Sequence, residues 1–98
     1  MHLISRRPLK EFWESHPDSE SSLRHWITAV ESAHWKSFAE VRLLFGSADQ
    51  VEKFTIFNIA GNKYRLIVVI HYPKTVYVRH MLTHKEYETD KWKKKSRA

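Results

Sequence analysis

The sequence contains no cysteine among its 98 residues. A disulfide framework and a thiolate metal site are therefore excluded, and the composition suits a reducing compartment such as the cytoplasm. Long apolar runs are also absent: the longest extends from Leu66 to Ile70, whereas a membrane helix needs about 20 apolar residues. The opening residues, Met1 to Arg7, lack the apolar segment of a secretory signal. We therefore expect a soluble, cytoplasmic protein with no membrane partner.

Acidic side chains are outnumbered: the chain has 11 Asp and Glu against 17 Lys and Arg, with a formal net charge of +6 and a pI near 9.7. A basic balance of this kind favours an anionic partner such as nucleic acid, and an acidic protein would also fit. A chain of this length can bury one modest core. We expect a single domain over residues 1–98 whose functional groups lie on an open surface, without a deep cofactor cavity.

Glycine is scarce, and each of the two glycines marks a predicted boundary. Gly46 ends the helical part of the chain, in which apolar residues recur at helical spacing. The last helix before Gly46 begins with Ser37 and carries Glu40 three residues later, the pattern of a capping box. The pattern as a whole predicts a short strand and then three helices, over residues 2–4, 8–13, 19–33 and 38–45.

Gly61 and Asn62 are the centre of a predicted two-residue turn between segments rich in β-branched and aromatic residues. Such a turn places Asn58 opposite Arg65 on neighbouring strands. The segments predict an antiparallel meander of three strands, over residues 54–59, 64–70 and 75–82.

A second capping-box sequence, Thr83 to Glu86, begins a final helix that we expect to reach Trp92. Residues 93–98 are then expected to form a frayed tail. The predicted fold class is therefore α+β: one small antiparallel sheet, packed against the N-terminal helices and followed by a short C-terminal helix.

The second hairpin has two possible registers. A three-residue loop, residues 73–75, puts Arg79 on the same face as Arg65 and Leu82 on the other face. A two-residue loop instead puts His80 and His84 with Arg65, because a slip of one residue inverts a strand. We favour the three-residue loop, since it gathers the aliphatic residues on one face for the helices to cover.

Three segments of the sequence are most informative when they are taken together. They are Met1 to Ile4, the hairpin from Phe57 to Arg65, and Arg79 to Tyr87 with its Thr83-His84-Lys85-Glu86-Tyr87 sequence. Across nearly its whole length the chain resembles the HigB-type toxins of bacterial type II toxin–antitoxin systems, within the RelE-like superfamily of messenger-RNA-cleaving toxins.

This resemblance implies a compact RelE-like α+β domain with a basic, concave sheet surface. It implies an endoribonuclease, or mRNA interferase, that cleaves messenger RNA on the ribosome, inhibits translation and is neutralised by a cognate helix-turn-helix antitoxin of the HigA type. Operator DNA would be contacted only indirectly, through the antitoxin. We expect metal-independent chemistry without a cofactor, in the bacterial cytoplasm.

Cleaving RNA through its 2′-hydroxyl needs a base, cations to offset charge on the crowded phosphorus, and an acid for the departing 5′-oxygen. The resemblance assigns Arg65 to the scissile phosphate; the alternative is an arginine at the surface or core rim, paired with a carboxylate. Arg79 is a candidate second phosphate ligand. Its alternative role is structural, with its stem lying over the sheet.

His84 is the candidate for proton transfer, because histidine titrates near neutral pH. A helix start disfavours the protonated ring, which suits a base better than an acid. Tyr87 could stack on a nucleobase or donate a proton, and Lys85 could hold a phosphate. Against these roles, capping alone can explain Thr83 and Glu86.

Lys63, Asn62, Asn58 and His71 border the proposed surface and are candidates for RNA binding, although His71 also reads as an ordinary strand histidine. No histidine pair has the spacing of a zinc site, so we expect no metal. The other aromatic candidates are tryptophans. Trp13, Trp26 and Trp35 fit the core better than an antitoxin contact, whereas Trp92 and the terminal lysines either grip ribosomal RNA or belong to the solvated tail.

Two functions remain in competition. The first is the ribosome-dependent endoribonuclease toxin, for which the ribosome would supply the substrate geometry that an open surface lacks. The second is a non-catalytic basic protein, such as a decayed toxin, that binds RNA or an antitoxin. The presence of Arg65, Arg79, His84 and Tyr87 in one chain favours the first.

Overall fold

The computed structural model of the chain describes residues 1–93. The tail expected at residues 93–98 therefore lies, apart from Lys93, outside the described residues. No helix within the described part has the length and apolar character needed to cross a membrane. The helices are α1 (Arg7–Ser15), α2 (Glu20–Ser32), α3 (Phe38–Leu44) and α4 (His84–Glu88), with a 3-10 turn η1 (Pro17–Ser19), and the strands are β1 (His2–Ile4), β2 (Asp49–Val51), β3 (Phe54–Ile59), β4 (Tyr64–His71) and β5 (Thr75–Thr83).

The five strands form one sheet in the order β1-β5-β4-β3-β2. The predicted meander of β3, β4 and β5 is confirmed as antiparallel. β1 pairs in parallel with β5, and β2, which the sequence does not predict, pairs antiparallel with β3. The polar sequence Asp49-Gln50-Val51 has little strand propensity of its own, so β2 depends on its pairing with β3. The α+β fold class is confirmed.

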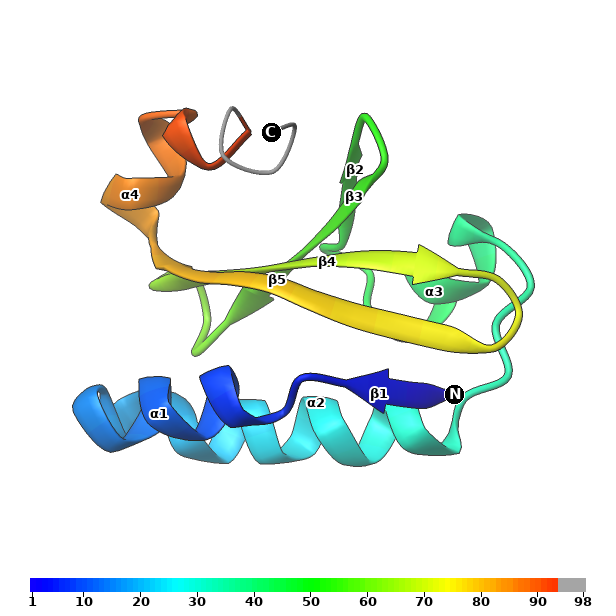
Figure 1. Cartoon of the computed structure of the whole chain (residues 1–98), viewed down its shortest axis with the longest axis horizontal. Helices are drawn as coiled ribbons and strands as arrows, with labels where there is room; N and C mark the ends of the chain where they lie inside the picture. The colour runs from blue at the N-terminus through cyan, green and yellow to red at the C-terminus, as the bar shows by residue number, and fades with distance from the viewer. Residues whose placement is uncertain (94–98) are drawn as a thin grey trace.

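The main hydrophobic core lies between the sheet and helices α1 and α2, which run along one face of the sheet (Figure 1). Trp26 and Trp35 are only 1% and 5% exposed, and Trp13 packs at the edge of this core. The core interpretation of these three tryptophans is therefore confirmed. The sheet contributes its helix-facing aliphatic side chains, Leu66, Val68, Ile70, Val76 and Val78.

A second, smaller core lies on the opposite face of the sheet, around Phe54, Ile56, Ile67 and Val69. Trp92 completes it and is only 3% exposed. The expectation that Trp92 grips RNA or belongs to a solvated tail is therefore wrong.

The single final helix predicted to reach Trp92 is also wrong. α4 ends at Glu88, and Asp90 then adopts a positive φ of 59°. This backbone conformation breaks the helix, because a residue with a positive φ cannot continue it. The chain turns back over the second face of the sheet and forms another helical turn at residues 91–93.

The register of the first hairpin is as predicted. Asn58 lies opposite Arg65, and Ile59 opposite Tyr64, so Gly61 and Asn62 occupy the centre of the turn. Ala60 and Gly61 have φ values of 55° and 70°. Gly61 meets this requirement without a steric penalty because it has no Cβ.

The second hairpin combines the two side-chain facings that the sequence left open. Its loop has three residues, but they are 72–74 and not the expected 73–75, so Val69 pairs with Tyr77. The pairing moves by two residues, which leaves the near half of the strand facing as predicted. A bulge then shifts the register between Ile67 and Val68, so that Arg65 pairs with Leu82. The placement of Leu82 on the helix-facing side is therefore wrong, because it packs in the second core with Phe54. A bulge adds one residue to one strand, and this inverts every side chain beyond it.

The two predicted capping boxes differ in outcome. At the start of α4, Thr83 and Glu86 form both bonds of the box, as predicted. At the start of α3, the Ser37 side chain makes no cap, and Glu40 accepts from the backbone N–H of Lys36 instead. The Ser37 box is therefore wrong, and only the position of the helix start is right.

Candidate active site

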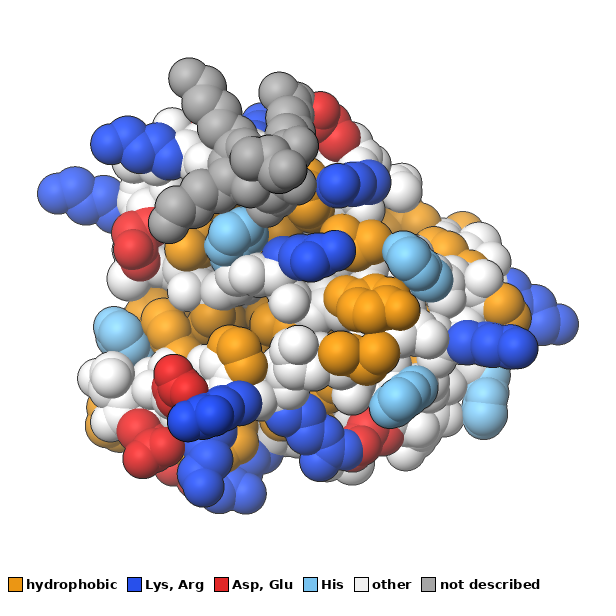
Figure 2. Space-filling model, in the orientation of Figure 1, with side chains coloured by type: hydrophobic (Ala, Val, Ile, Leu, Met, Phe, Trp, Pro, Cys, Tyr) orange, Lys and Arg blue, Asp and Glu red, His pale blue; other side chains and the backbone are white. Residues whose placement is uncertain are grey.

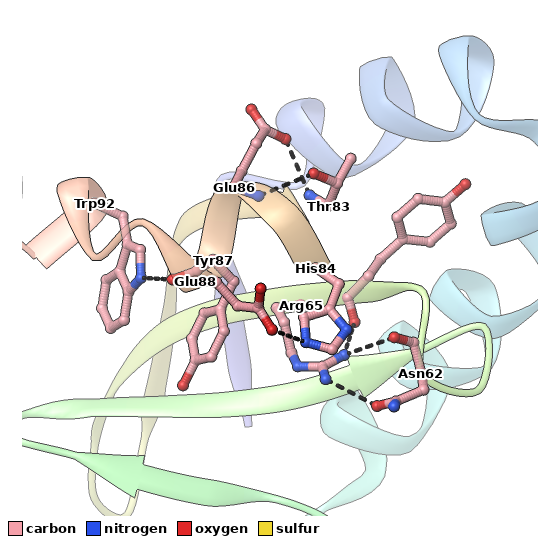
Figure 3. A network of polar contacts seen from close by, with 9 residues as sticks. Asn62, Arg65, Thr83, His84, Glu86, Tyr87, Glu88 and Trp92 are labelled. Atoms are coloured by element: carbon pink, nitrogen blue, oxygen red, sulfur yellow. Dashed lines mark hydrogen bonds and ion pairs between the residues drawn. The ribbon is translucent and has the colours of Figure 1, made fainter.

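Arg65 is a buried arginine near the start of β4, only 8% exposed. Its Nη1 donates to the carbonyl oxygens of Asn62 and Tyr64, both at 3.1 Å, and its Nη2 donates to Oδ1 of Asn62 at 2.8 Å (Figure 3). These bonds use three of the five N–H groups that a guanidinium carries. Within residues 1–93, Arg65 forms no ion pair with a carboxylate. Its positive charge is therefore held in place by neutral oxygens and is not neutralised by a carboxylate of the described residues.

The hairpin turn explains how Arg65 is held. Asn62 follows the positive-φ residues Ala60 and Gly61. Both Asn62 oxygens lie toward the guanidinium (Figure 3). A planar guanidinium matches such a pair of acceptors better than a lysine ammonium does. The turn sequence thus has a second role beyond joining two strands, which is to orient Arg65.

His84 begins α4 directly after the end of β5. Because β4 and β5 are antiparallel, the end of β5 lies beside the start of β4, where Arg65 is located. The backbone N–H of His84 donates to the carbonyl of Lys63 at 3.0 Å, and the Thr83 capping box fixes the first turn of the helix. The His84 side chain is 43% exposed, and its Nε2 lies 2.8 Å from Oε1 of Glu88.

Tyr87 lies over the guanidinium of Arg65, with 5.7 Å between Cζ and the ring centroid. Tyr87 also contacts Trp92. The two rings stack with their centroids 5.5 Å apart, and the Trp92 Nε1 donates to the Tyr87 backbone carbonyl at 3.1 Å. Burial raises the pKa of the Tyr87 phenol above its usual value of 10.0, and the charge of Asp49 acts in the same direction, whereas Lys93 and Arg65 oppose it. The phenol therefore keeps its proton at neutral pH.

Lys63 and Tyr64 connect the hairpin to the helical layer through Asp18 of η1. Lys63 donates to Oδ2 of Asp18 at 3.0 Å, and the Tyr64 hydroxyl donates to Oδ1 at 2.7 Å. The bond from Tyr64, followed by that from Lys63, lowers the pKa of Asp18, and the same bond to Asp18 raises the pKa of Tyr64. Lys63, a candidate for RNA binding, thus has a carboxylate partner within the protein.

The structure brings together Arg65, Asn62 and Asn58 from the first hairpin with His84 and Tyr87 from α4. Three further candidates, Arg79, Lys85 and His71, lie outside this group. Arg79 is exposed, and as the extra residue of the β5 bulge it has no cross-strand partner in the ladder. Lys85 is exposed on α4, and His71 lies at the other end of β4, against the Tyr77 ring.

Sequence reasoning missed three residues of this site. Glu88 pairs with His84 four residues earlier, a helical spacing that the sequence displays openly. Trp92 supports Tyr87, but the break at Asp90 hides this from helical periodicity. Asp49 acts on Tyr87 from β2, and because the sequence does not predict β2, no local signal indicates its place.

Two surface pockets lie outside the candidate site. A pocket of about 360 Å³ lies beside α4 and is lined by His80, Leu82 and Trp92, among others, but not by Arg65 or His84. Within residues 1–93, no three His, Asp or Glu side chains gather closely enough to hold a metal ion.

A larger pocket of about 480 Å³ lies between α1 and α2, with Trp13 and Ile27 in its lining. Positive and negative side chains mix over this helical layer, at the bottom of Figure 2. Its arginines are matched by carboxylates, in the pairs Arg6–Glu31, Arg7–Glu11 and Arg24–Glu20. Arg65, by contrast, is buried without such a match.

Comparison with known proteins agrees with this geometry. Residues 19–90 match the HigB toxin family, described as the RelE-like toxic component of a toxin–antitoxin system. The chain is also 28% identical over 92 residues to the mRNA interferase toxin HigB of Escherichia coli strain K12, covering 90% of this chain and 88% of that protein. The mRNA interferase HigB proteins of Escherichia coli O157:H7 and Shigella flexneri give the same identity and coverage. Since the family match spans more than half of the chain, the protein belongs to the HigB family of RelE-like toxins of toxin–antitoxin systems.

Proposed function

We propose that this toxin is a metal-independent endoribonuclease that cleaves messenger RNA during translation on the ribosome. The single observation that carries the proposal is the Arg65 guanidinium, which is buried, oriented by Asn62 and not neutralised by a carboxylate within residues 1–93. His84 and Tyr87 lie beside it and supply groups for proton transfer. The relatives named as mRNA interferases support the same activity.

The proposed reaction needs only the RNA and these side chains. The 2′-oxygen attacks the adjacent phosphorus while its proton passes to the His84 ring. The bond from phosphorus to the 5′-oxygen breaks, and Tyr87 donates a proton to that oxygen, leaving a 2′,3′-cyclic phosphate and a 5′-hydroxyl. Arg65 offsets the negative charge that grows on the phosphorus oxygens. Because burial raises its pKa, the Tyr87 phenol is protonated at neutral pH and has a proton to donate.

The position of the candidate residues supports the proposed dependence on the ribosome. Arg65, His84 and Tyr87 lie outside the two pockets described, so the protein offers few walls that could orient an RNA strand. A ribosome that holds the messenger RNA could supply this orientation instead. We assign Lys85, which is exposed, to a neighbouring phosphate, and Asn58, which pairs with Arg65 across the hairpin, to RNA contact.

The family implies a cognate antitoxin. We propose that it is a helix-turn-helix protein of the HigA type and that operator DNA is reached only through it. The proposed substrate and the ribosome place the toxin in the bacterial cytoplasm. Arg79 and His71, which lie apart from Arg65, are assigned to RNA contact at most.

The test is cleavage mapping of a defined messenger RNA, alone and in a translating extract, with wild-type protein and Arg65→Lys. Lysine keeps the charge but cannot reproduce the planar contact with both Asn62 oxygens. We expect cuts only during translation, with a rate reduced about 100-fold in the variant. Arg24→Lys, on the helical layer, is the matched control and should cleave like wild type.

Each other outcome has a distinct meaning. Cuts in free RNA would contradict the dependence on the ribosome. Equal rates for wild type and Arg65→Lys would contradict the role of Arg65. No cuts under either condition, from protein shown to be folded by circular dichroism, would favour the non-catalytic binding protein.

A further inference from the structure

We propose that Glu88 is a positioning residue that fixes the tautomer of His84. In this arrangement the proton of the neutral imidazole stays on Nε2, facing Glu88, and Nδ1 is the atom that accepts the proton of the 2′-hydroxyl. The inference rests on the proposed function for its catalytic meaning. The pairing itself stands on geometry and can be tested without RNA.

The first support is the contact between the two side chains. Nε2 of His84 lies 2.8 Å from Oε1 of Glu88, one helical turn further along α4. An ionised carboxylate can only accept, so Nε2 must carry the hydrogen. In a neutral imidazole the other nitrogen then has a free lone pair. Figure 3 shows the ring with one nitrogen directed at Glu88.

The second support is the way in which His84 is fixed at its backbone. Its N–H donates to the carbonyl of Lys63 at 3.0 Å, and Thr83 and Glu86 close the capping box around it. With the backbone held, the bond to Glu88 settles the remaining freedom of the ring. The side chain is still 43% exposed, so an RNA strand can reach it.

If Glu88 served only to stabilise the fold, its removal would lower the stability of the protein. The two side chains are 43% and 68% exposed, and ion pairs this open add little to stability. Within residues 1–93, Glu88 is the carboxylate that pairs with His84, and Arg65 forms no ion pair with a carboxylate. Removing Glu88 should therefore change the state of the ring much more than the stability of the fold.

The experiment is nitrogen-15 NMR of the histidine rings at a pH where they are neutral, in wild type, Glu88→Ala and Glu88→Gln. Signals of His84 are assigned by their loss in His84→Gln. We expect wild type to show the Nε2–H tautomer alone, and Glu88→Ala to show a mixture with a clear Nδ1–H population. Glu88→Gln keeps an oxygen that can accept the bond and should restore the wild-type spectrum.

Cleavage in the translating extract is the second measurement. Glu88→Ala should cleave roughly tenfold more slowly, and Glu88→Gln within about threefold of wild type. Glu20→Gln, from the exposed pair with Arg24 on α2, is the control and should match wild type in both measurements. Thermal melts should agree among all variants.

The outcomes separate this inference from the proposed function. Identical His84 spectra in wild type and Glu88→Ala would overturn the positioning role, whether or not the protein cleaves RNA. A spectrum that changes as described, in a protein that cleaves no RNA, would support the pairing and overturn the proposed function instead. Slow cleavage in both Glu88→Ala and Glu88→Gln, with unchanged spectra, would also reject the tautomer inference.

Discussion

At the scale of single residues, the proposed chemistry rests on Arg65 and Tyr87. Burying a charge is costly unless hydrogen bonds replace water. Arg65 meets that cost with three carbonyl-type acceptors and no carboxylate within residues 1–93, so its charge is not neutralised there by an acidic side chain. The aromatic ring of Tyr87 covers the guanidinium and favours the cation further.

Tyr87 should make the protein sensitive to alkaline pH. Its pKa is raised in the folded state, so the unfolded chain releases the phenolic proton more readily. The corresponding stability is complete below about pH 10 and is lost as the pH rises through the folded pKa. Urea unfolding of wild type and Tyr87→Phe at pH 8 and above pH 10 measures this. We expect stability to fall less steeply with pH in Tyr87→Phe, and equal slopes would contradict the assignment.

At the scale of elements, α4 is a five-residue helix that depends on its cap. Thr83→Ala removes one bond of the capping box and should destabilise the protein by about 1 kcal/mol. Because His84 and Tyr87 both lie on α4, cleavage should fall as well. Thr83→Ser keeps the hydroxyl and should behave like wild type in both chemical denaturation and cleavage. Unchanged stability in Thr83→Ala would show that the cap does not hold the helix.

The first hairpin and the start of α4 are the parts of the candidate site that sequence reasoning predicted well. A Gly61-Asn62 turn and a Thr83 to Glu86 box are local signals, since each depends on residues within a few positions. These two signals predict that Arg65 and His84 lie close together, because a turn and an antiparallel pairing determine which strand ends are neighbours. Local signals were therefore enough to predict this part of the candidate site.

The bulge in β5 is the feature that sequence reasoning could not resolve. The aliphatic pattern favoured a single register along the whole strand, whereas the structure inverts the side chains beyond the bulge, where Arg79 is the extra residue. A hydrophobic pattern is insensitive to such an insertion when both faces of the sheet are covered. Here both faces are covered, because the chain after α4 turns back and packs Trp92 against the second face of the sheet. Arg79 was consequently expected beside Arg65.

At the scale of the whole molecule, the hairpin that holds Arg65 is anchored to the helical layer through Asp18. Hydrogen bonds from Tyr64 and then Lys63 lower the pKa of Asp18 below its usual value of 3.8. Stability from this lowered pKa is present above pH 3.8 and is lost as the pH falls through the folded value.

Asp18→Asn should therefore be less stable than wild type at pH 7, and this difference should shrink as the pH falls below about 3.8. Chemical denaturation at neutral and acid pH gives the comparison. Glu14→Gln, an exposed change on α1, should show no such trend. A deficit in Asp18→Asn that stays constant down to pH 2 would contradict the anchoring role.

The arrangement of the molecule places the helical layer on one face of the sheet and the candidate active site at the end of the other, beside α4 (Figure 1). We propose that Arg65, His84 and Tyr87 at this end cleave RNA through its 2′-hydroxyl. Because this reaction breaks one bond in the substrate, a change at that bond gives the sharpest test.

The measurement is cleavage of a messenger RNA in a translating extract, once its cut site has been mapped, with a single 2′-deoxynucleotide placed on the 5′ side of that bond. The account predicts that the unmodified RNA yields a 2′,3′-cyclic phosphate and a 5′-hydroxyl, and that the deoxy substitution abolishes the cut. Continued cleavage at the substituted bond, or products that carry a 5′-phosphate, would contradict it.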